Sequence, residues 1–175
     1  MTTREITVTL RNFEEHPKAL AFIRSEAKRK MARAGRRGAK TVAVATMDIE
    51  DFLGWERVIN GVLVKSPPKR VLYTGPTKEQ TDTYWREVNL ALGDVCNEGI
   101  FHKNETERFI ENPAKPENRL KAKTVWDVDS ARGDYGDKLY PDEAQLMDGR
   151  AWYEVLQPML IDHDGDAAII YTPPV

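Results

Sequence analysis

The sequence predicts an α/β protein with a mainly parallel β-sheet covered by helices on both faces. Short apolar segments that end in turn residues, as expected of buried strands, occur at 71–74 and 167–172. Segments with apolar residues at helical spacing lie beside them in the chain, at 77–92 and 152–160. Parallel strands must be joined by crossovers, which are usually helices, so this alternation favours a parallel sheet.

The first third of the chain predicts an arm or short strand, a helix, a loop and a second helix. Residues 1–15 alternate weakly between apolar and polar side chains, and residues 17–30 have helical spacing with a basic far side. A basic loop with two glycines, 32–41, then opens onto a helix that ends near Gly54.

The middle of the chain predicts a hairpin and a strand–turn–helix unit. Asn60-Gly61 lies between apolar residues within 55–68, which is typical of a tight hairpin turn. The 71–74 strand is followed by Thr77, which with Gln80 forms a capping box for the next helix.

The last third predicts a second hairpin, two strands and a helix. Alternating runs at 107–112 and 119–126 indicate a hairpin with a longer loop. A brief strand at 137–140 precedes two adjacent carboxylates, Asp142 and Glu143, and the 152–160 helix precedes the final strand.

Composition predicts one soluble domain over residues 1–175 in a reducing compartment. A single cysteine, Cys96, cannot form an internal disulfide, and no apolar stretch reaches the roughly 20 residues that span a bilayer. The formal net charge of -2 gives no overall sign of nucleic-acid binding. However, basic residues gather in the first quarter and acidic residues near 127–148, so folding can bring a basic and an acidic loop together around a polyanion.

Residues 32–41, ARAGRRGAKT, are similar to a phosphate-binding loop at the start of a helix. In the pattern Gly-x4-Gly-Lys-Ser/Thr, glycines let backbone N–H groups surround the anion, the lysine reaches phosphate oxygens and the hydroxyl holds Mg²⁺. Here Ala34 and Ala39 occupy the two glycine positions. A basic loop that only caps a helix is the alternative, and the loop alone does not decide. The candidate nucleotide-binding residues are Gly35, Arg36, Arg37, Gly38, Ala39, Lys40 and Thr41.

Three further positions complete a candidate site. A phosphate site needs one carboxylate for Mg²⁺ and another to orient the attacking water, and Asp142 and Glu143 follow a strand. Thr172 ends the last strand, where a hydroxyl can sense the γ-phosphate. Arg132 lies on a glycine-bearing turn, from which it can reach charge in a transition state. The alternatives are exposed acids at a helix start, an ordinary strand-ending threonine and a surface arginine paired with Asp129 or Asp134.

Taken in order, four segments resemble the ATPase domain of bacteriophage terminase large subunits, the motors that package DNA into a preformed capsid. They are RAGRRGAKTVAVA, RVLYTGPTKEQTDTYWREV, ARGDYGDKLYPDEAQLMD and AWYEVLQPMLIDHDGDAAIIYTPP. The resemblance covers residues 16–174 and depends on the order of the motifs. It implies a RecA-like P-loop ATPase fold with a mainly parallel sheet, flanking helices and an added β-hairpin. It also implies that the nuclease domain which normally follows is absent.

The resemblance implies ATP and Mg²⁺ as ligands and assigns a role to each candidate residue. Lys40 and Thr41 contact phosphates and Mg²⁺, Asp142 is the Walker B carboxylate, and Glu143 is the catalytic glutamate. Thr172 belongs to the coupling motif. The arginine finger is Arg132 from a neighbouring subunit, or Arg36 or Arg37 of the same chain.

The resemblance also implies partners and a location. These are double-stranded DNA, the capsid portal, the terminase small subunit and copies of the chain in a homo-oligomeric ring, although the isolated domain can be a monomer. The expected location is the host cell cytoplasm, in the packaging complex and not in the mature virion, with no membrane association.

Two other interpretations remain open. Ala39 replaces the glycine before the lysine, with a strain of about 1–2 kcal/mol if its φ is positive, and Pro141 precedes the first carboxylate. Both favour a catalytically weak P-loop module that binds nucleotide or DNA and serves in assembly. Another RecA-like ATPase, such as a helicase, shares the core motifs.

Overall fold

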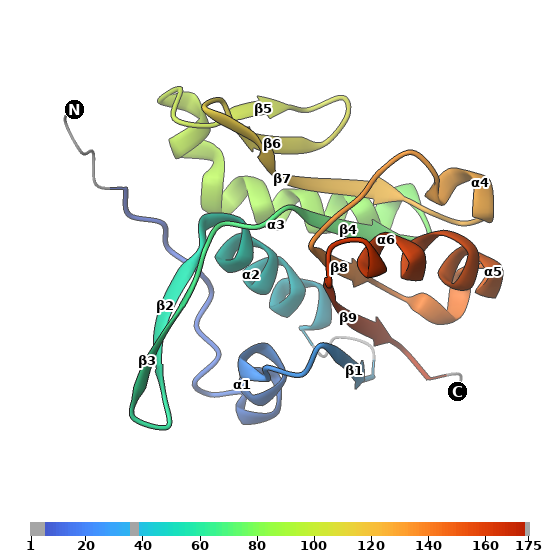
Figure 1. Cartoon of the computed structure of the whole chain (residues 1–175), viewed down its shortest axis with the longest axis horizontal. Helices are drawn as coiled ribbons and strands as arrows, with labels where there is room; N and C mark the ends of the chain where they lie inside the picture. Colours follow the sequence, from blue (N-terminus) through green and yellow to red (C-terminus); the bar gives the residue numbers. More distant parts are fainter. Residues whose placement is uncertain (1–5, 36–38, 174–175) are drawn as a thin grey trace.

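The centre of the molecule is a seven-stranded sheet in the order β1-β9-β8-β4-β7-β6-β5 (Figure 1). The computed structural model describes residues 6–35 and 39–173. The strands are β1 (Arg29–Arg33), β4 (Val71–Gly75), β5 (His102–Asn104), β6 (Phe109–Asn112), β7 (Lys115–Thr124), β8 (Lys138–Pro141) and β9 (Asp166–Tyr171). From β1 to β7 the neighbouring strands are parallel, whereas β6 and β5 are antiparallel additions. The predicted mainly parallel α/β sheet is confirmed.

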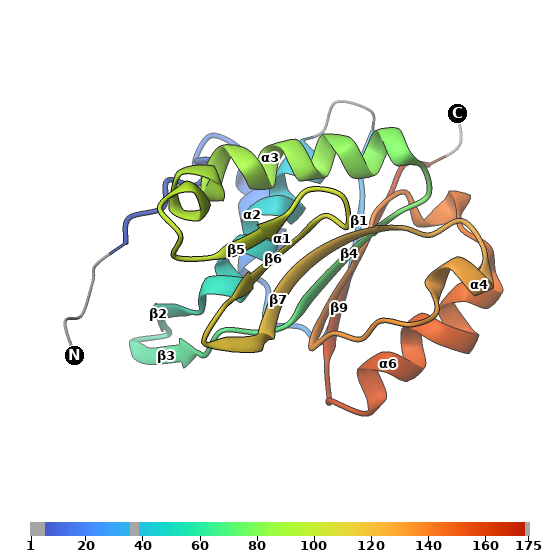
Figure 2. The same ribbon diagram turned by 90° about the horizontal axis from the view of Figure 1, so that it is seen from above.

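Helices cover both faces of the sheet (Figure 2). One face holds α1 (Pro17–Arg24), α2 (Lys40–Leu53) and α3 (Lys78–Asn97). The other holds α4 (Val128–Ala131) and a helix made of α5 (Gly149–Ala151), the π-helical η2 (Trp152–Leu156) and α6 (Gln157–Ile161). The short 3₁₀ helix η1 (Ala144–Leu146) follows β8.

Alternating side chains of the central strands build the two hydrophobic cores. In β4, Val71 and Tyr73 face the core beneath α2 and α3, whereas Leu72 faces the core beneath the other helices. Residue Tyr140 of β8 likewise belongs to the first core and Leu139 to the second. All five residues of β4 are buried because the strand has both neighbours and both faces covered.

The predicted helices α2 and α3 and the first hairpin are confirmed. Helix α2 ends at Gly54, whose φ is 78°, and the side chain of Thr77 accepts a hydrogen bond from the Gln80 N–H at the start of α3. The hairpin consists of β2 (Trp55–Ile59) and β3 (Val62–Ser66), joined by Asn60 and Gly61, and it projects from the body (Figure 1).

The first segment differs from the prediction in the extent of its helix, whereas its first residues form the arm that was one of the two predicted alternatives. The helix predicted over 17–30 ends at Arg24, and residues 29–33 instead form β1, which pairs in parallel with β9. Residues 6–15 contain no strand; they run over the surface as an arm and bury Phe13. The basic residues of 29–33 therefore lie on an edge strand rather than on the far side of a helix.

The second hairpin is confirmed as β6 and β7, but the longer loop predicted for it is wrong: β7 already begins at Lys115, so only Pro113 and Ala114 join the strands. The hairpin also carries an additional edge strand, β5.

Pro141 is accommodated because it is the last residue of β8. The pairing of β8 with β9 already ends at Leu139. On the side of β4, the N–H that follows Pro141, from Asp142, donates to the Thr74 carbonyl at 2.8 Å. Thus no ladder bond requires an N–H at Pro141.

Among the described residues, no helix has the length and apolar character needed to cross a membrane.

Candidate phosphate-binding site

The start of α2 meets the carboxyl end of β8, and this brings together residues about a hundred positions apart. The Thr41 hydroxyl donates a 2.8 Å hydrogen bond to Asp142 Oδ2. The ammonium of Lys40 lies 3.8 Å from Glu143 Oε1, and the Lys40 side chain is only 8% exposed. Lys40 and Thr41, at the end of the predicted basic loop, therefore face the predicted acidic pair.

Ala39, directly before α2, has the positive φ for which the sequence predicted strain. This residue caps the helix with φ 53° and ψ 22°, in the left-handed region, and its carbonyl accepts from the Ala43 N–H. The first N–H groups of a helix lack intrahelical acceptors, so this end attracts anions. Lys40 Nζ donates to the carbonyls of Ala34 and Gly35, both at 3.1 Å, which ties the amine to the loop.

Three candidate nucleotide-binding residues, Arg36, Arg37 and Gly38, lie outside the described residues. The predicted nest of N–H groups and the arginine finger in the same chain fall on this segment, and they remain predictions.

Asp142 is a buried carboxylate with one oxygen occupied and one free. Its Oδ2 accepts from Thr41 and, at 2.9 Å, from the hydroxyl of Tyr73, whereas Oδ1 is buried and has no hydrogen-bond partner among the residues that the structure describes. Burial raises the pKa of Asp142 above its usual value, although the hydrogen bonds from Thr41 and Tyr73 partly oppose this effect. Such an acceptor is costly to bury unless something binds it.

This donor set fits a Mg²⁺ ion. A carboxylate and a hydroxyl are hard oxygen ligands, and Mg²⁺ usually takes only one or two protein groups together with water and substrate phosphates. Within the described part of the chain, no cluster of three or more His, Cys, Asp or Glu could hold a metal without such help.

Glu143 is held in place by the end of β9. Its Oε1 accepts from the Thr172 hydroxyl at 2.8 Å, and its Oε2 accepts from the Thr172 N–H at 3.2 Å and from the Gln145 amide at 2.6 Å. Burial would raise the pKa of Glu143, but the hydrogen bonds from Gln145 and Thr172 and the charge of Lys40 outweigh burial and lower it. Glu143 is therefore an ionised carboxylate, aligned by Thr172.

Arg132 is not drawn into this cluster. It follows α4, its side chain is 60% exposed, and its guanidinium lies 3.5 Å from Asp129. This pairing is the alternative that the sequence left open, and a role in a neighbouring subunit stays a prediction.

Sequence reasoning missed Tyr73 and Gln145, the neighbours that orient the two carboxylates. Tyr73 carried a signal, because a hydroxyl in an otherwise apolar buried strand requires a buried partner. Gln145 gave none, since its role depends on the left-handed turn at Glu143.

A pocket of about 620 Å³ lies between α1 and the start of α2, beside Ala34 and Ala39. Its lining is mainly apolar and includes Pro17, Phe22, Ala34, Ala39 and Ala43. Such a pocket suits a flat aromatic group beside a charged one.

No protein-family model matches the sequence, and no curated protein is similar to it in sequence. Solved structures are similar in fold. The large terminase ATPase domain of Thermus phage P74-26 matches with a TM-score of 0.68 and 23% identity over 89% of this chain and 64% of that one. The large terminase of bacteriophage HK97 matches with a TM-score of 0.62 and 15% identity, over 93% and 33% of the two chains.

A third similar structure is the large terminase of a thermophilic bacteriophage in complex with ADP, with a TM-score of 0.53 and 13% identity over 91% of this chain and 38% of that one. This chain thus spans about two thirds of the first of these proteins and a smaller share of the others. The sheet order, the helix layers and these matches together show that the chain has the RecA-like fold of phage large-terminase ATPase domains.

Proposed function

We propose that this chain is the Mg²⁺-dependent ATPase domain of a phage terminase large subunit and powers the movement of double-stranded DNA into a capsid. One observation carries the proposal: the pair Lys40-Thr41 at the start of α2 meets the pair Asp142-Glu143 across a gap bridged by a 2.8 Å hydrogen bond and a 3.8 Å ion pair. This is the arrangement that hydrolysis of a nucleoside triphosphate needs.

Each residue then has a distinct task. Thr41 directs its hydroxyl proton to Asp142, so its oxygen lone pairs would be available to hold the cation, and Asp142 Oδ1 would hold it directly or through water. Lys40 neutralises phosphate oxygens, and Glu143 orients the attacking water because it remains ionised at neutral pH. A bound Mg²⁺ would stabilise the charge that develops on the phosphates.

The remaining parts of the site suit the substrate and the coupling step. The apolar pocket beside the loop would take the base of ATP. Thr172 would transmit the event, because it binds Glu143 through both its N–H and its hydroxyl and directly follows β9. A change at Glu143 during hydrolysis would reach the end of β9 through these bonds.

The partners follow from the same proposal. DNA, the capsid portal, the small subunit and a ring of identical subunits would surround the domain in the packaging complex, in the host cytoplasm. Portal-dependent DNA uptake, as opposed to separation of DNA strands, would distinguish this motor from a helicase.

The test is phosphate release from Mg²⁺-ATP by the parent chain and by Glu143→Ala. Loss of the group that orients water should lower turnover by at least about 100-fold. Glu154→Ala is the control, because Glu154 is an exposed acid on the opposite helix layer.

A second candidate is a weak P-loop module that binds nucleotide without efficient turnover. The observation in its favour is Ala39, whose left-handed turn places a methyl group in the loop where glycine is usual. Nucleotide binding without phosphate release in the parent, or release that Glu143→Ala leaves unchanged, would favour this module over the motor.

A further inference from the structure

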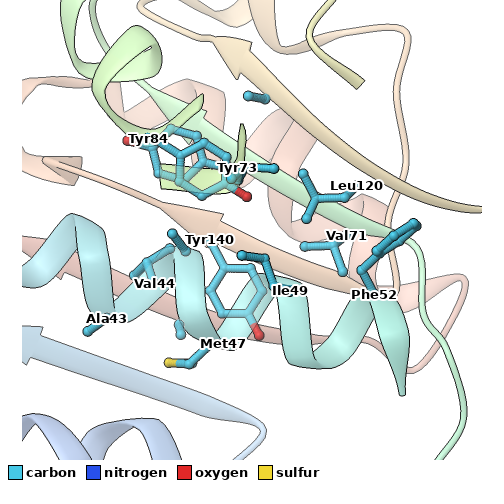
Figure 3. Packing of buried hydrophobic residues seen from close by; sticks show 14 of the residues in the cluster. Ala43, Val44, Met47, Ile49, Phe52, Val71, Tyr73, Tyr84, Leu120 and Tyr140 are labelled. Carbon is cyan, nitrogen blue, oxygen red and sulfur yellow. The ribbon is translucent and has the colours of Figure 1, made fainter. Parts of the chain in front are cut away.

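A buried pair of stacked tyrosines lies directly behind the acidic pair. The rings of Tyr73 from β4 and Tyr84 from α3 are nearly parallel, at 6°, with centroids 3.6 Å apart (Figure 3). Both residues are fully buried. The hydroxyl of Tyr73 donates to Asp142 Oδ2 at 2.9 Å, and that of Tyr84 donates to Asp48 Oδ2 at 2.5 Å.

The strand around Tyr73 leaves its hydroxyl little freedom. The end of the ring packs against Gly75, where a Cβ would lie 3.4 Å from both Cε1 and the hydroxyl of Tyr73. One face of the ring is covered by Tyr84, and β4 is paired on both sides. These contacts hold the ring in place, and among the described residues its hydroxyl donates to Asp142 Oδ2.

The hydrogen bond from Tyr84 to Asp48 connects the tyrosine pair to α2, the helix that begins with Lys40 and Thr41. Asp48 lies on α2, as does Thr41, so hydrogen bonds and stacking connect α2, β8, β4 and α3 in a closed circuit. Burial raises the pKa of Asp48 well above its usual value, which favours a neutral acid in this circuit.

We propose that Tyr73 is a positioning residue for the cation site, which holds Asp142 through Oδ2 so that Oδ1 remains free for Mg²⁺ or its water. The inference rests on the proposed function. Thr41 donates to the same oxygen, but in the proposed site its hydroxyl is shared with the cation. The bond from Tyr73 is made within the chain itself and needs no nucleotide, so it can orient the carboxylate before a nucleotide binds.

The experiment measures binding of a fluorescent ADP analogue over a series of Mg²⁺ concentrations and in EDTA. Tyr73→Phe keeps the ring and its stack and removes only the donor. The Mg²⁺ concentration for half-maximal binding should rise about tenfold, as for other groups that orient a metal ligand. Affinity in EDTA should stay within about twofold of the parent value, because the phosphate contacts of the loop are retained.

Tyr140→Phe is the matched control. Tyr140 is also a buried tyrosine of the central sheet, but its hydroxyl donates to Asp51 instead of Asp142. It should lose stability without a shift in the Mg²⁺ midpoint, and thermal unfolding of both variants separates the two effects.

Three results would overturn the inference. The first is an unchanged Mg²⁺ midpoint in Tyr73→Phe, and the second is an equal shift in Tyr140→Phe. The third concerns Tyr84→Phe, which replaces Tyr73→Phe if that variant does not fold. Tyr84→Phe keeps the Tyr73 hydroxyl, so a tenfold shift of its Mg²⁺ midpoint would assign the effect to the tyrosine cluster in general. A parent chain that binds no ADP, or binds it without regard to Mg²⁺, refutes the proposed function itself, and the role of Tyr73 falls with it.

Discussion

Ala39 and Glu143 both have left-handed backbone conformations, with φ of 53° and 48°, and each stands directly before a helix of the candidate site. A residue with a Cβ pays about 1–2 kcal/mol for this conformation. Glu143 is held there by the bonds from Thr172 and Gln145 to its carboxylate. The side chain of Ala39 instead packs against the core beneath α2 and α3, which holds the residue in its turn. Strain of this kind at both halves of one site is typical of functional turns.

Ala39→Gly should therefore stabilise the protein by about 0.5–1 kcal/mol, since glycine adopts positive φ without strain but loses more entropy on folding. Urea denaturation measures the change. Ala32→Gly in β1 is the control, because a glycine in a strand should destabilise by roughly 0.5–1 kcal/mol. If Ala39→Gly is as destabilising as Ala32→Gly, the left-handed turn is not strained.

At the scale of elements, the end of α2 determines how the hairpin leaves the body. Gly54 has φ 78°, and a Cβ there would lie 2.9 Å from Pro68 Cδ, Pro68 N and Ser66 O. The chain before the hairpin thus passes against the chain after it. Only glycine satisfies both the dihedral angle and the close approach of backbone.

Gly54→Ala should destabilise the protein by more than about 2 kcal/mol, because left-handed strain and a backbone clash add. Gly61 is the comparison: it has φ 80° but open space around its Cβ position, so Gly61→Ala should lose only about 1 kcal/mol. The difference between the two urea midpoints isolates the contact with Pro68. Equal midpoints would contradict the close packing at this junction.

The elements that the sequence predicted are those with their own local pattern. Helices α2 and α3 have apolar residues at helical spacing, and the first hairpin has Asn60-Gly61. Edge strands β1 and β5 were missed because their sequences, RKMAR and HKN, are polar and depend on distant partners. In β1, only the parallel pairing with β9, more than 130 residues away, distinguishes a strand from a basic helix.

The same distinction applies to the site. The loop, the acidic pair and Thr172 could be selected from sequence order, and the structure brings Lys40, Thr41, Asp142, Glu143 and Thr172 together. The orienting contacts of Tyr73 and Gln145 arise only from strand register and a turn, which local sequence does not encode. The register of β4 and β8 pairs Tyr73 with Tyr140, two positions before Asp142, and so places its hydroxyl near that carboxylate.

At the scale of the whole molecule, the site and Arg132 are separate within one chain. The start of α2 and the acidic pair meet at the carboxyl end of β8, whereas Arg132 follows α4, a helix on the other face of the sheet (Figure 1), and is exposed and paired only loosely with Asp129. A 3.5 Å contact between two exposed side chains contributes little to stability. Arg132 is thus free to exchange Asp129 for another anion, and a phosphate in an adjacent copy of the chain is the partner that the proposed ring would supply.

This arrangement predicts that ATPase turnover per molecule depends on protein concentration. If Arg132 acts on a neighbouring subunit, dilute chains should turn over slowly, and turnover should rise at least ~10-fold as chains associate, well within the range of arginine fingers. Arg132→Ala should remove the rise and leave the dilute rate unchanged, because the variant loses nothing within its own site. Arg150→Ala is the matched control: Arg150 is also exposed and pairs with a nearby aspartate, Asp148, so its loss should leave the rise intact. Turnover that does not change with concentration in the parent, or a rise that Arg132→Ala retains, would place the finger elsewhere, in which case Arg36 or Arg37 of the same chain becomes the candidate to substitute.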